Sequence, residues 1–416
     1  MSRLAFPLLM VILVGMVLAP LILQPGHLLY PREGQATDLT VTHWPAVTFN
    51  ARTLREFGQV PLWRTYIASG GPWAANPQSW LLYPPAWLFF VLPANLTFNV
   101  LLLAHLSLAA VATYAFGRKA LDLEPRAAAL AGLAYAVAPW LSGQLAAGHI
   151  NVVLALSWLP VALLAIHQAI TAGSLGDALL AGVAWAAALL NHAQMALFIA
   201  GLTLAWSILA MSMPGSSVPR ARRAILLLCT GAVGLLLSAA LLVPLAEALP
   251  YLNRTTLSLA EAGALSLSWP HLLTVLIPTY GGEPEQVVYA GLPLAVLALA
   301  GVVLVRDRIS WFLLGVTALS ALFALGINGP LFPLLFRLMP GLSWLRIPAR
   351  AWVLVTLCLA LLAGRGLQGA CQRNLTTTAR GRLTRIGLGV LVVGLALAGG
   401  LGLLYRPLPP AVWVLA

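Results

Sequence analysis

The first apolar run of the chain, residues 4–23, reads LAFPLLMVILVGMVLAPLIL and decides the fold class. A helix of this length crosses the roughly 30 Å hydrocarbon core of a bilayer. Similar runs recur along all 416 residues, of which 61% are hydrophobic and 8% charged. A soluble domain with this composition has too few polar residues to cover its surface. We therefore predict an integral membrane protein and interpret 4–23 as an uncleaved first span, with cleavage near Ala19 as the alternative.

About eleven runs are long enough to cross the membrane as helices. Pro139, Pro160, Pro244 and Pro293 fall in or near these runs and indicate kinks or broken ends. The sequence predicts an all-α polytopic helix bundle that forms one transmembrane domain over residues 1–416. The expected spans are 4–23, 96–117, 127–142, 151–170, 177–191, 194–212, 224–245, 288–305, 309–327, 349–370 and 386–404.

The distribution of Lys and Arg indicates which loops face the cytoplasm. With the N-terminus inside, short loops such as 117–126 and 219–223 hold most of the basic residues, as the positive-inside rule requires. The other loops are longer and contain most of the acids. We therefore expect an extracytoplasmic functional face, made by the loops at 24–95, 246–287 and 328–348.

Several function classes find no support in the sequence. The net charge of +12 is spread between apolar runs, without the basic stripe and interleaved aromatic residues typical of nucleic-acid binding. Contact with the lipid bilayer and loop orientation account for this charge. The three cysteines form no CxxC pair, which excludes a disulfide framework from the prediction. The expected span midplanes hold few ionisable groups, unlike those of channels and symporters.

The first outer loop, 24–95, is too long to be a simple connector. It opens with an unusual group of ionisable residues, because residues 32–47 read REGQATDLTVTHWPAV and bring Glu33, Asp38 and His43 close together in sequence. Downstream, residues 40–63 carry apolar side chains near helical spacing, which predicts a helix lying in the membrane interface.

The second half of this loop, residues 58–87, is rich in aromatic residues and is punctuated by Pro and Gly, which fix turns. Two roles suit its aromatic side chains, namely anchoring at the depth of the lipid headgroups and lining a substrate groove. The residues concerned are Trp63, Tyr66, Trp73, Trp80, Tyr83 and Trp87.

An ordered set of motifs resembles bacterial YfhO-type membrane proteins, which belong to the GT-C class of integral-membrane glycosyltransferases. The resemblance covers about residues 30–370, although the chain is shorter than typical members. The motifs are TDLTVTHWPAV (37–47), GQVPLWRTYIASGGPWAANPQSWLLYPPAWL (58–88), HINVVLALSWLPVALL (149–164), NHAQMALFIAG (191–201), VPLAEALPYLNRTTLS (243–258), LSLSWPHLLTVLIPTYGG (265–282) and LRIPARAWVLVTLCLALLAGRGL (345–367).

This resemblance implies a glycosyltransferase of the bacterial inner membrane. Such a protein takes a sugar from a polyprenyl-phosphate donor and passes it to an extracytoplasmic acceptor. In this class an acid of the first outer loop generally serves as catalytic base, and Asp38 occupies that place in TDLTVTHWP. A transporter or flippase of a lipid-linked glycan, and a non-catalytic degenerate homologue, are the competing interpretations.

The chemistry of glycosyl transfer asks for a base and for cations near the leaving phosphate. Asp38 is the first candidate for the base and Glu33 the alternative. Either carboxylate could instead bind a divalent metal together with His43, since hard cations favour oxygen ligands. A purely structural interpretation is that Asp38 caps the helix expected to begin near Leu39.

Three arginines are candidates for the phosphate site. Arg346 and Arg350 flank Pro348 at the expected start of a helix on the outer side. A guanidinium binds phosphate through its planar fork, and a helix N-terminus adds partial positive charge. Arg254 is a further candidate. Anchoring to lipid headgroups is the alternative role for these side chains.

Further polar residues of the outer loops and outer helix ends are candidates for a substrate cavity, with isolated helix-end hydrogen bonds as the alternative. Among them, Glu247 could pair with Arg254 or Arg350 instead of holding a sugar hydroxyl. The candidates are Asn76, Gln78, Tyr83, His149, His192, Gln194, Glu247 and Tyr280, together with His43.

Overall fold

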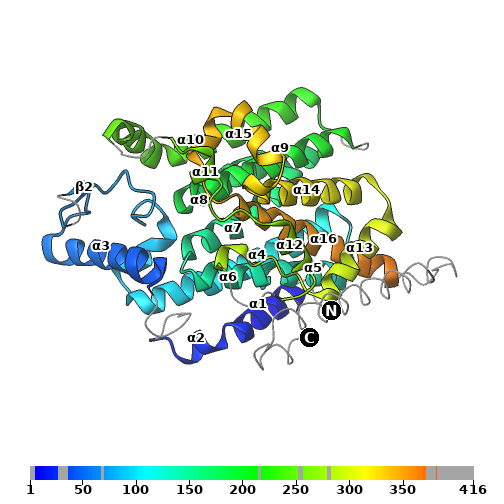
Figure 1. Ribbon diagram of the computed structural model, residues 1–416, viewed down its shortest axis with the longest axis horizontal. Coiled ribbons are helices and arrows are strands. Elements are labelled where there is room, and N and C mark those ends of the chain that lie inside the picture. Colours follow the sequence, from blue (N-terminus) through cyan, green and yellow to red (C-terminus); the bar gives the residue numbers. More distant parts are fainter. Residues whose placement is uncertain are drawn as a thin grey trace. The chain divides into compact units, whose positions relative to one another are not determined.

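The computed structural model describes residues 5–26, 36–66, 70–213, 217–251, 256–278, 283–371 and 381. Within these residues nearly every element is a helix, which confirms the all-α prediction at the level of fold class (Figure 1). The two strands, β1 (Trp63–Arg64) and β2 (Gly71–Pro72), form one short antiparallel pair. The backbone packing divides the chain into two units, residues 1–120 with 144–257 and residues 121–143 with 258–416.

The first unit is built around α7, which packs against α4, α8 and α9. Almost every residue of α7 is buried, as expected for a helix that is hydrophobic on all sides. The helices of this unit are α1 (Ala5–Val17), α2 (Ala19–Leu23), α3 (Trp44–Phe57), α4 (Ala94–Ala120), α7 (Ile150–Ala172), α8 (Leu175–Asn191), α9 (Ala193–Ser212) and α10 (Arg220–Ala248), with the shorter turns η1 (Leu39–His43), η2 (Pro84–Phe90) and η3 (Leu249–Tyr251).

The second unit is built around α16, which packs against α5, α13 and α14. Gly301 on α13 and Gly366 on α16 allow the closest approach, since a Cβ at either position would overlap the backbone of the facing helix. The elements of this unit are α5 (Pro125–Ala136), α11 (Leu259–Ala262), α12 (Trp269–Leu273), η4 (Pro284–Gln286), α13 (Leu292–Val305), α14 (Arg308–Ala324), η5 (Gly326–Asn328), α15 (Leu331–Leu338), η6 (Pro340–Trp344), η7 (Pro348–Ala351) and α16 (Trp352–Cys371). The chain passes into the first unit within α6 (Pro139–Ala146).

Five helices of the described residues are long and apolar enough to cross a membrane. They are Ala94–Ala120, Ile150–Ala172, Ala193–Ser212, Arg220–Tyr251 and Pro348–Cys371. Four further predicted spans form shorter apolar helices, Ala5–Val17, Leu175–Asn191, Leu292–Val305 and Arg308–Ala324. The structure therefore supports a polytopic membrane protein, while the count of eleven spans stays a prediction.

One predicted span, 127–142, does not form a single helix. Helix α5 ends at Ala136 and α6 begins at Pro139. The break follows from Pro139, which cannot donate a backbone hydrogen bond and disfavours helical geometry in the residue before it. The last predicted span, 386–404, lies outside the described residues.

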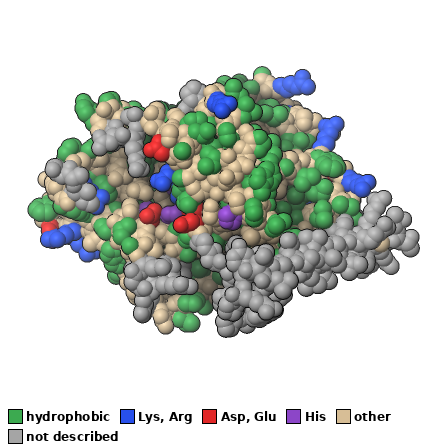
Figure 2. Space-filling view, in the orientation of Figure 1, with side chains coloured by type: hydrophobic (Ala, Val, Ile, Leu, Met, Phe, Trp, Pro, Cys, Tyr) green, Lys and Arg blue, Asp and Glu red, His purple; other side chains and the backbone are tan. Residues whose placement is uncertain are grey.

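Exposed apolar side chains cover much of the face drawn in Figure 2. Helix α10 is the clearest case, because only 28% of its most apolar stretch is buried inside the protein. Leu228 and Leu236 on this helix are 73% and 74% exposed. Such a surface is stable only against another apolar phase, which is the role of lipid in a membrane protein.

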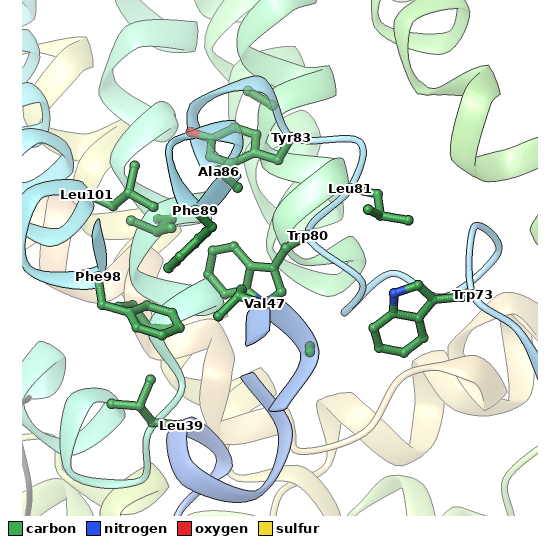
Figure 3. Packing of buried hydrophobic residues seen from close by; sticks show 14 residues of the cluster. Leu39, Val47, Trp73, Trp80, Leu81, Tyr83, Ala86, Phe89, Phe98 and Leu101 are labelled. Atoms are coloured by element: carbon green, nitrogen blue, oxygen red, sulfur yellow. The ribbon is translucent and has the colours of Figure 1, made fainter. Parts of the chain in front are cut away.

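Aromatic side chains of the first outer loop form a hydrophobic core together with residues of α4, α7 and α8 (Figure 3). Trp73, Trp80 and Tyr83 are buried in a cluster that includes Phe89 of η2 and Phe98 of α4. Burial of these three side chains argues against anchoring in headgroups, while lining a substrate groove stays a prediction, and Trp73 does line a cavity. A loop of this length needs apolar contacts to offset the entropy of ordering its backbone, and large aromatic side chains supply them. Trp63, Tyr66 and Trp87 remain exposed.

Candidate functional site

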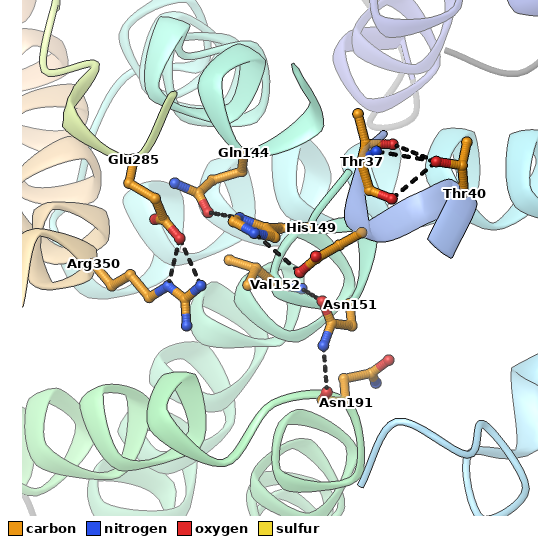
Figure 4. Close-up of polar contacts among 10 residues, drawn as sticks. Thr37, Thr40, Gln144, His149, Asn151, Val152, Asn191, Glu285 and Arg350 are labelled. Carbon is orange, nitrogen blue, oxygen red and sulfur yellow. Dashed lines mark hydrogen bonds and ion pairs between the residues drawn. The ribbon is translucent and has the colours of Figure 1, made fainter. Parts of the chain in front are cut away.

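Asp38 lies directly before η1, the turn that connects to α3. The predicted cap is not formed, because the Asp38 side chain makes no capping hydrogen bond. Two threonines stabilise the turn instead. The backbone N–H of Thr37 donates to Thr40 Oγ1 at 3.0 Å, and the Thr40 hydroxyl donates to the Thr37 carbonyl at 3.0 Å (Figure 4). The carboxylate of Asp38 is therefore available for another contact.

That contact is an ion pair with His149, which precedes α7. Asp38 Oδ2 lies 3.2 Å from His149 Nε2. The other ring nitrogen, Nδ1, lies 3.2 Å from Oε1 of Gln144 on α6, so the ring is held at both ends (Figure 4). The His149 side chain is 13% exposed and that of Asp38 is 45% exposed. The carboxylate is thus fixed on one side and open to solvent on the other.

The backbone brings these two residues together. The N–H of Asp38 donates to the carbonyl of Ala147 at 3.1 Å. Gly148 has a φ of +82°, and a Cβ there would collide with the backbone nitrogens of Asp38 and Leu39. Only glycine meets both conditions at low cost. The GH pair in the sequence AAGHIN therefore marks the place where the outer loop docks on the turn before α7.

His43 lies at the other end of η1 and is fully buried. Burial lowers its pKa to about 4, although the charge of Asp38 raises it in part, so the ring is neutral at pH 7. Trp80 Nε1 donates to His43 Nδ1 at 3.1 Å, which leaves the ring proton on Nε2. The Asn151 side chain lies beside this ring, but among the described residues Nε2 has no partner of normal hydrogen-bond geometry.

The Trp80 backbone is strained at this point. Its φ is +65°, in the left-handed region that bulky residues avoid. Such a conformation costs about 1–2 kcal/mol and persists only when its surroundings enforce it. Here the conformation places the indole so that it donates to His43 and packs edge-on against Phe89 and Phe98.

The described residues contain no group of three or more His, Cys, Asp or Glu side chains arranged to hold a metal ion. Because Glu33 is not among these residues, the metal site stays a prediction. His43 has its Nδ1 occupied by Trp80 and its Nε2 buried. Glu33, the alternative base and metal ligand, lies outside the described residues, as do Arg254 and Tyr280.

The remaining polar candidates near α7 make helix-end contacts. His192 caps α9, with Nδ1 accepting the N–H of Met195 at 3.4 Å. Asn151 Nδ2 donates to the carbonyl of Asn191 at 3.3 Å, which joins the start of α7 to the end of α8. Gln194 is buried in the first turn of α9. For His192 the structure therefore shows a hydrogen bond at a helix end, which was the alternative to a place in the substrate cavity.

Arg350 binds an acid that the sequence analysis did not select as its partner. Its Nε and Nη2 donate to Glu285 Oε1 at 3.0 and 2.6 Å, and both side chains are almost buried (Figure 4). Arg346 is exposed. Glu247, the expected partner, is exposed on α10 and has no ion pair with any described residue. Arg350 belongs to the second unit and Asp38 to the first, so the shared cavity expected for them stays a prediction.

Three candidates lie in the first outer loop. Tyr83 is buried, bonds to His105 and accepts a hydrogen bond from Trp158 Nε1 at 3.0 Å. Burial raises the pKa of its hydroxyl to about 12, which suits a structural residue better than a substrate contact. Asn76 accepts the N–H of Gln78 at 2.8 Å in a turn, and Gln78 is exposed.

Gln144 and Glu285 were missed by sequence reasoning. Each acts through a partner distant in sequence, and neither lies in a motif that names a chemistry. In the sequence, a buried acid such as Glu285 can be recognised at most as an acidic residue near the start of an apolar segment, which is a weak indication of burial.

No protein-family model matches the chain, and no curated protein matches it.

Proposed function

We propose that the protein is a membrane glycosyltransferase that moves a sugar from a polyprenyl-phosphate donor to an acceptor outside the cytoplasm. One observation carries the proposal most directly. The Asp38 carboxylate is held by His149 at 3.2 Å and yet remains 45% exposed, as a base that must reach an incoming hydroxyl needs to be. The YfhO-like motifs, in which Asp38 takes the position of the catalytic acid, supply the substrate class.

The proposed reaction uses few protein groups. Asp38 accepts the proton of the acceptor hydroxyl while the acceptor oxygen bonds to the anomeric carbon. The bond between that carbon and the phosphate oxygen breaks, and polyprenyl phosphate leaves with the bonding electrons. His149 acts as a positioning residue, because its second contact with Gln144 fixes the ring against which the carboxylate rests.

The environment of the donor supports the same proposal. A polyprenyl tail requires an apolar phase, and the protein offers helices such as α10 whose apolar side chains are exposed. The phosphate and sugar then lie at the bilayer surface. The predicted topology puts the first outer loop, and with it Asp38, at that depth.

Lipid extracts test the proposal without knowledge of the acceptor. Cells lacking the protein are complemented with wild type, Asp38→Asn or Glu56→Gln, and polyprenyl-phosphate sugars are quantified by mass spectrometry. Loss of a general base typically lowers the rate by 10²–10⁴-fold, so we expect Asp38→Asn to accumulate the unused donor like the null strain. Glu56, an exposed acid of the same loop paired with Arg52, serves as the matched control.

Two results would contradict the proposal. One is wild-type donor consumption by Asp38→Asn at equal membrane abundance. The other is movement of the intact lipid-linked sugar between leaflets of reconstituted vesicles without release of polyprenyl phosphate, which is the behaviour of a flippase.

A further inference from the structure

An arginine of the first outer loop lies over two aromatic rings. The guanidinium carbon of Arg64, on β1, lies 4.6 Å from the centre of the Trp73 ring and 5.3 Å from that of Tyr66. Trp73 is itself fixed, since its Nε1 donates to Asn50 Oδ1 at 2.7 Å and Asn50 Nδ2 donates to the Ser79 carbonyl at 2.6 Å. The ring on which the Arg64 guanidinium rests is therefore held in place by contacts within the loop.

The charge of Arg64 has no carboxylate partner among the described residues. Other arginines there do have one, for example Arg52 with Glu56 and Arg350 with Glu285. Its Nε is buried and has no hydrogen-bond partner in the described part of the chain. The neighbouring Tyr66 hydrogen-bonds to the Arg64 side chain, but partial burial raises the pKa of its hydroxyl, so it stays neutral and supplies no counter-charge. A partly buried cation without a counter-charge is costly, and an anion from outside would remove that cost.

The structure leaves room for such an anion. A cavity of about 410 Å³ is lined by Arg64, by Asn76 and by Leu245 at the end of α10, and no acid lines it. The residue paired with Arg64 across the hairpin is Gly71, so the two positions face the same side of the strand pair. A Cβ at Gly71 would meet no atom within 4 Å, which leaves the space beside Arg64 open.

We propose that this cavity, the Arg64 pocket, binds the phosphate group of a ligand. The planar fork of a guanidinium pairs with phosphate through two parallel hydrogen bonds, and its five N–H donors are more than the contact with Tyr66 uses. The exposed Trp63 and Tyr66 of the same hairpin suit headgroup depth, where phosphate is the prevailing anion. The pocket stands independently of sugar transfer, since it requires no reaction at Asp38.

A binding experiment with three probes tests the proposal and identifies the source of the phosphate. The full-length protein in detergent is titrated by calorimetry with a hexose 1-phosphate, with a short-chain prenyl phosphate and with the uncharged prenol. Binding of the hexose phosphate assigns a soluble ligand, and binding of only the prenyl phosphate assigns a lipid ligand; both support the pocket. Failure of both phosphates to bind, or equal binding of prenol and prenyl phosphate, overturns it.

Variants separate a ligand site from a structural arginine. A charge-assisted hydrogen bond lost from a site corresponds to about 10- to 100-fold in affinity, which is the loss expected for Arg64→Gln. Arg64→Lys keeps the positive charge but lacks the planar fork, so its phosphate affinity should lie between those of wild type and Arg64→Gln. Gly71→Leu fills the open space and should weaken binding at an unchanged melting temperature. Arg52→Gln, an exposed arginine of the same loop, should bind like wild type.

Unchanged phosphate affinity in both Arg64→Gln and Gly71→Leu would contradict the proposal even if Arg64→Gln were less stable. Asp38→Asn should retain full phosphate affinity. A failure of the Arg64 pocket and a failure of the transferase proposal are therefore distinguishable.

Discussion

Two acid–base pairs, one in each unit, show how differently a membrane protein uses its few charges. Arg350 and Glu285 are 12% and 4% exposed and are joined by two hydrogen bonds from one guanidinium. Asp38 and His149 are joined by a single contact, and the carboxylate is 45% exposed. The buried pair is largely shielded from solvent. The open pair keeps an acid that is positioned and still reachable.

Position in the sequence does not reveal which charged side chains are open to solvent. Arg350 lies in a motif that resembles a phosphate site, yet its guanidinium is bonded to a buried acid. Measurements of unfolding and of activity test the difference between the two pairs.

Removing the buried acid should give the largest effect. Glu285→Ala leaves the Arg350 charge almost buried without its partner, which typically costs 3–5 kcal/mol. Thermal unfolding in detergent measures this loss of stability, and Glu283→Ala, at an exposed position nearby, is the control. The double variant Glu285→Leu with Arg350→Met should regain much of the loss, since an apolar pair of similar size often replaces a buried ion pair without penalty. A Glu285→Ala protein as stable as the control would show that the pair is solvated.

Acid should destabilise the first unit through His43. Its pKa is about 4 when folded and near 6.5 when unfolded, so the unfolded state binds the proton more tightly. The contribution of neutral His43 to the free energy of unfolding is therefore fully present above pH 6.5. It declines as the pH falls toward 4, and about 2 kcal/mol is lost at pH 5. Melting curves between pH 7.5 and 5 should show this slope, and His43→Gln should flatten it. Burial also lowers the pKa of His271, so His271→Gln is the necessary parallel variant.

Loss of the positioning contact should have a smaller effect, seen in turnover. His149→Ala frees the Asp38 carboxylate to rotate, and we expect about tenfold slower donor consumption at equal protein abundance. His149→Gln, which can still donate to Asp38, should recover part of the rate. If His149→Ala consumed donor at the wild-type rate, the pair would have no role in orienting the acid.

The smallest effect should be that of Asp38→Asn on stability. An ion pair with a carboxylate 45% exposed contributes at most about 1 kcal/mol, because water screens it. The melting temperature should stay within a few degrees of wild type even though transfer is lost. A collapse in stability comparable to that of Glu285→Ala would erase the difference between the two pairs.

The sequence was sufficient for the helical fold and its membrane character, whereas the role of Asp38 stays a prediction and its contacts could not be predicted. Long apolar runs predict helices because burial in lipid demands them, whereas their ends depend on local details such as Pro139. Trp73 and Trp63 look alike in the sequence, yet Trp73 is 3% exposed and Trp63 is 56% exposed. A large aromatic side chain favours burial both at a membrane interface and in a protein core, so the residue type does not distinguish the two environments. The partners His149 and Glu285 depend on tertiary contacts between distant segments, which no local pattern encodes.

The hydrogen bond from Asp38 to Ala147 has a consequence for how the protein is made. Its acceptor is synthesised about 110 residues after its donor, which at 5–20 residues per second is a delay of roughly 5–20 s. Until α6 and the Gly148 turn have left the ribosome, η1 has nothing to dock against. With the predicted topology, the proposed catalytic acid would be among the earliest residues to cross the membrane. It can reach its final position only after α6 and the Gly148 turn have been made, so the nascent chain passes through a long interval without a formed site.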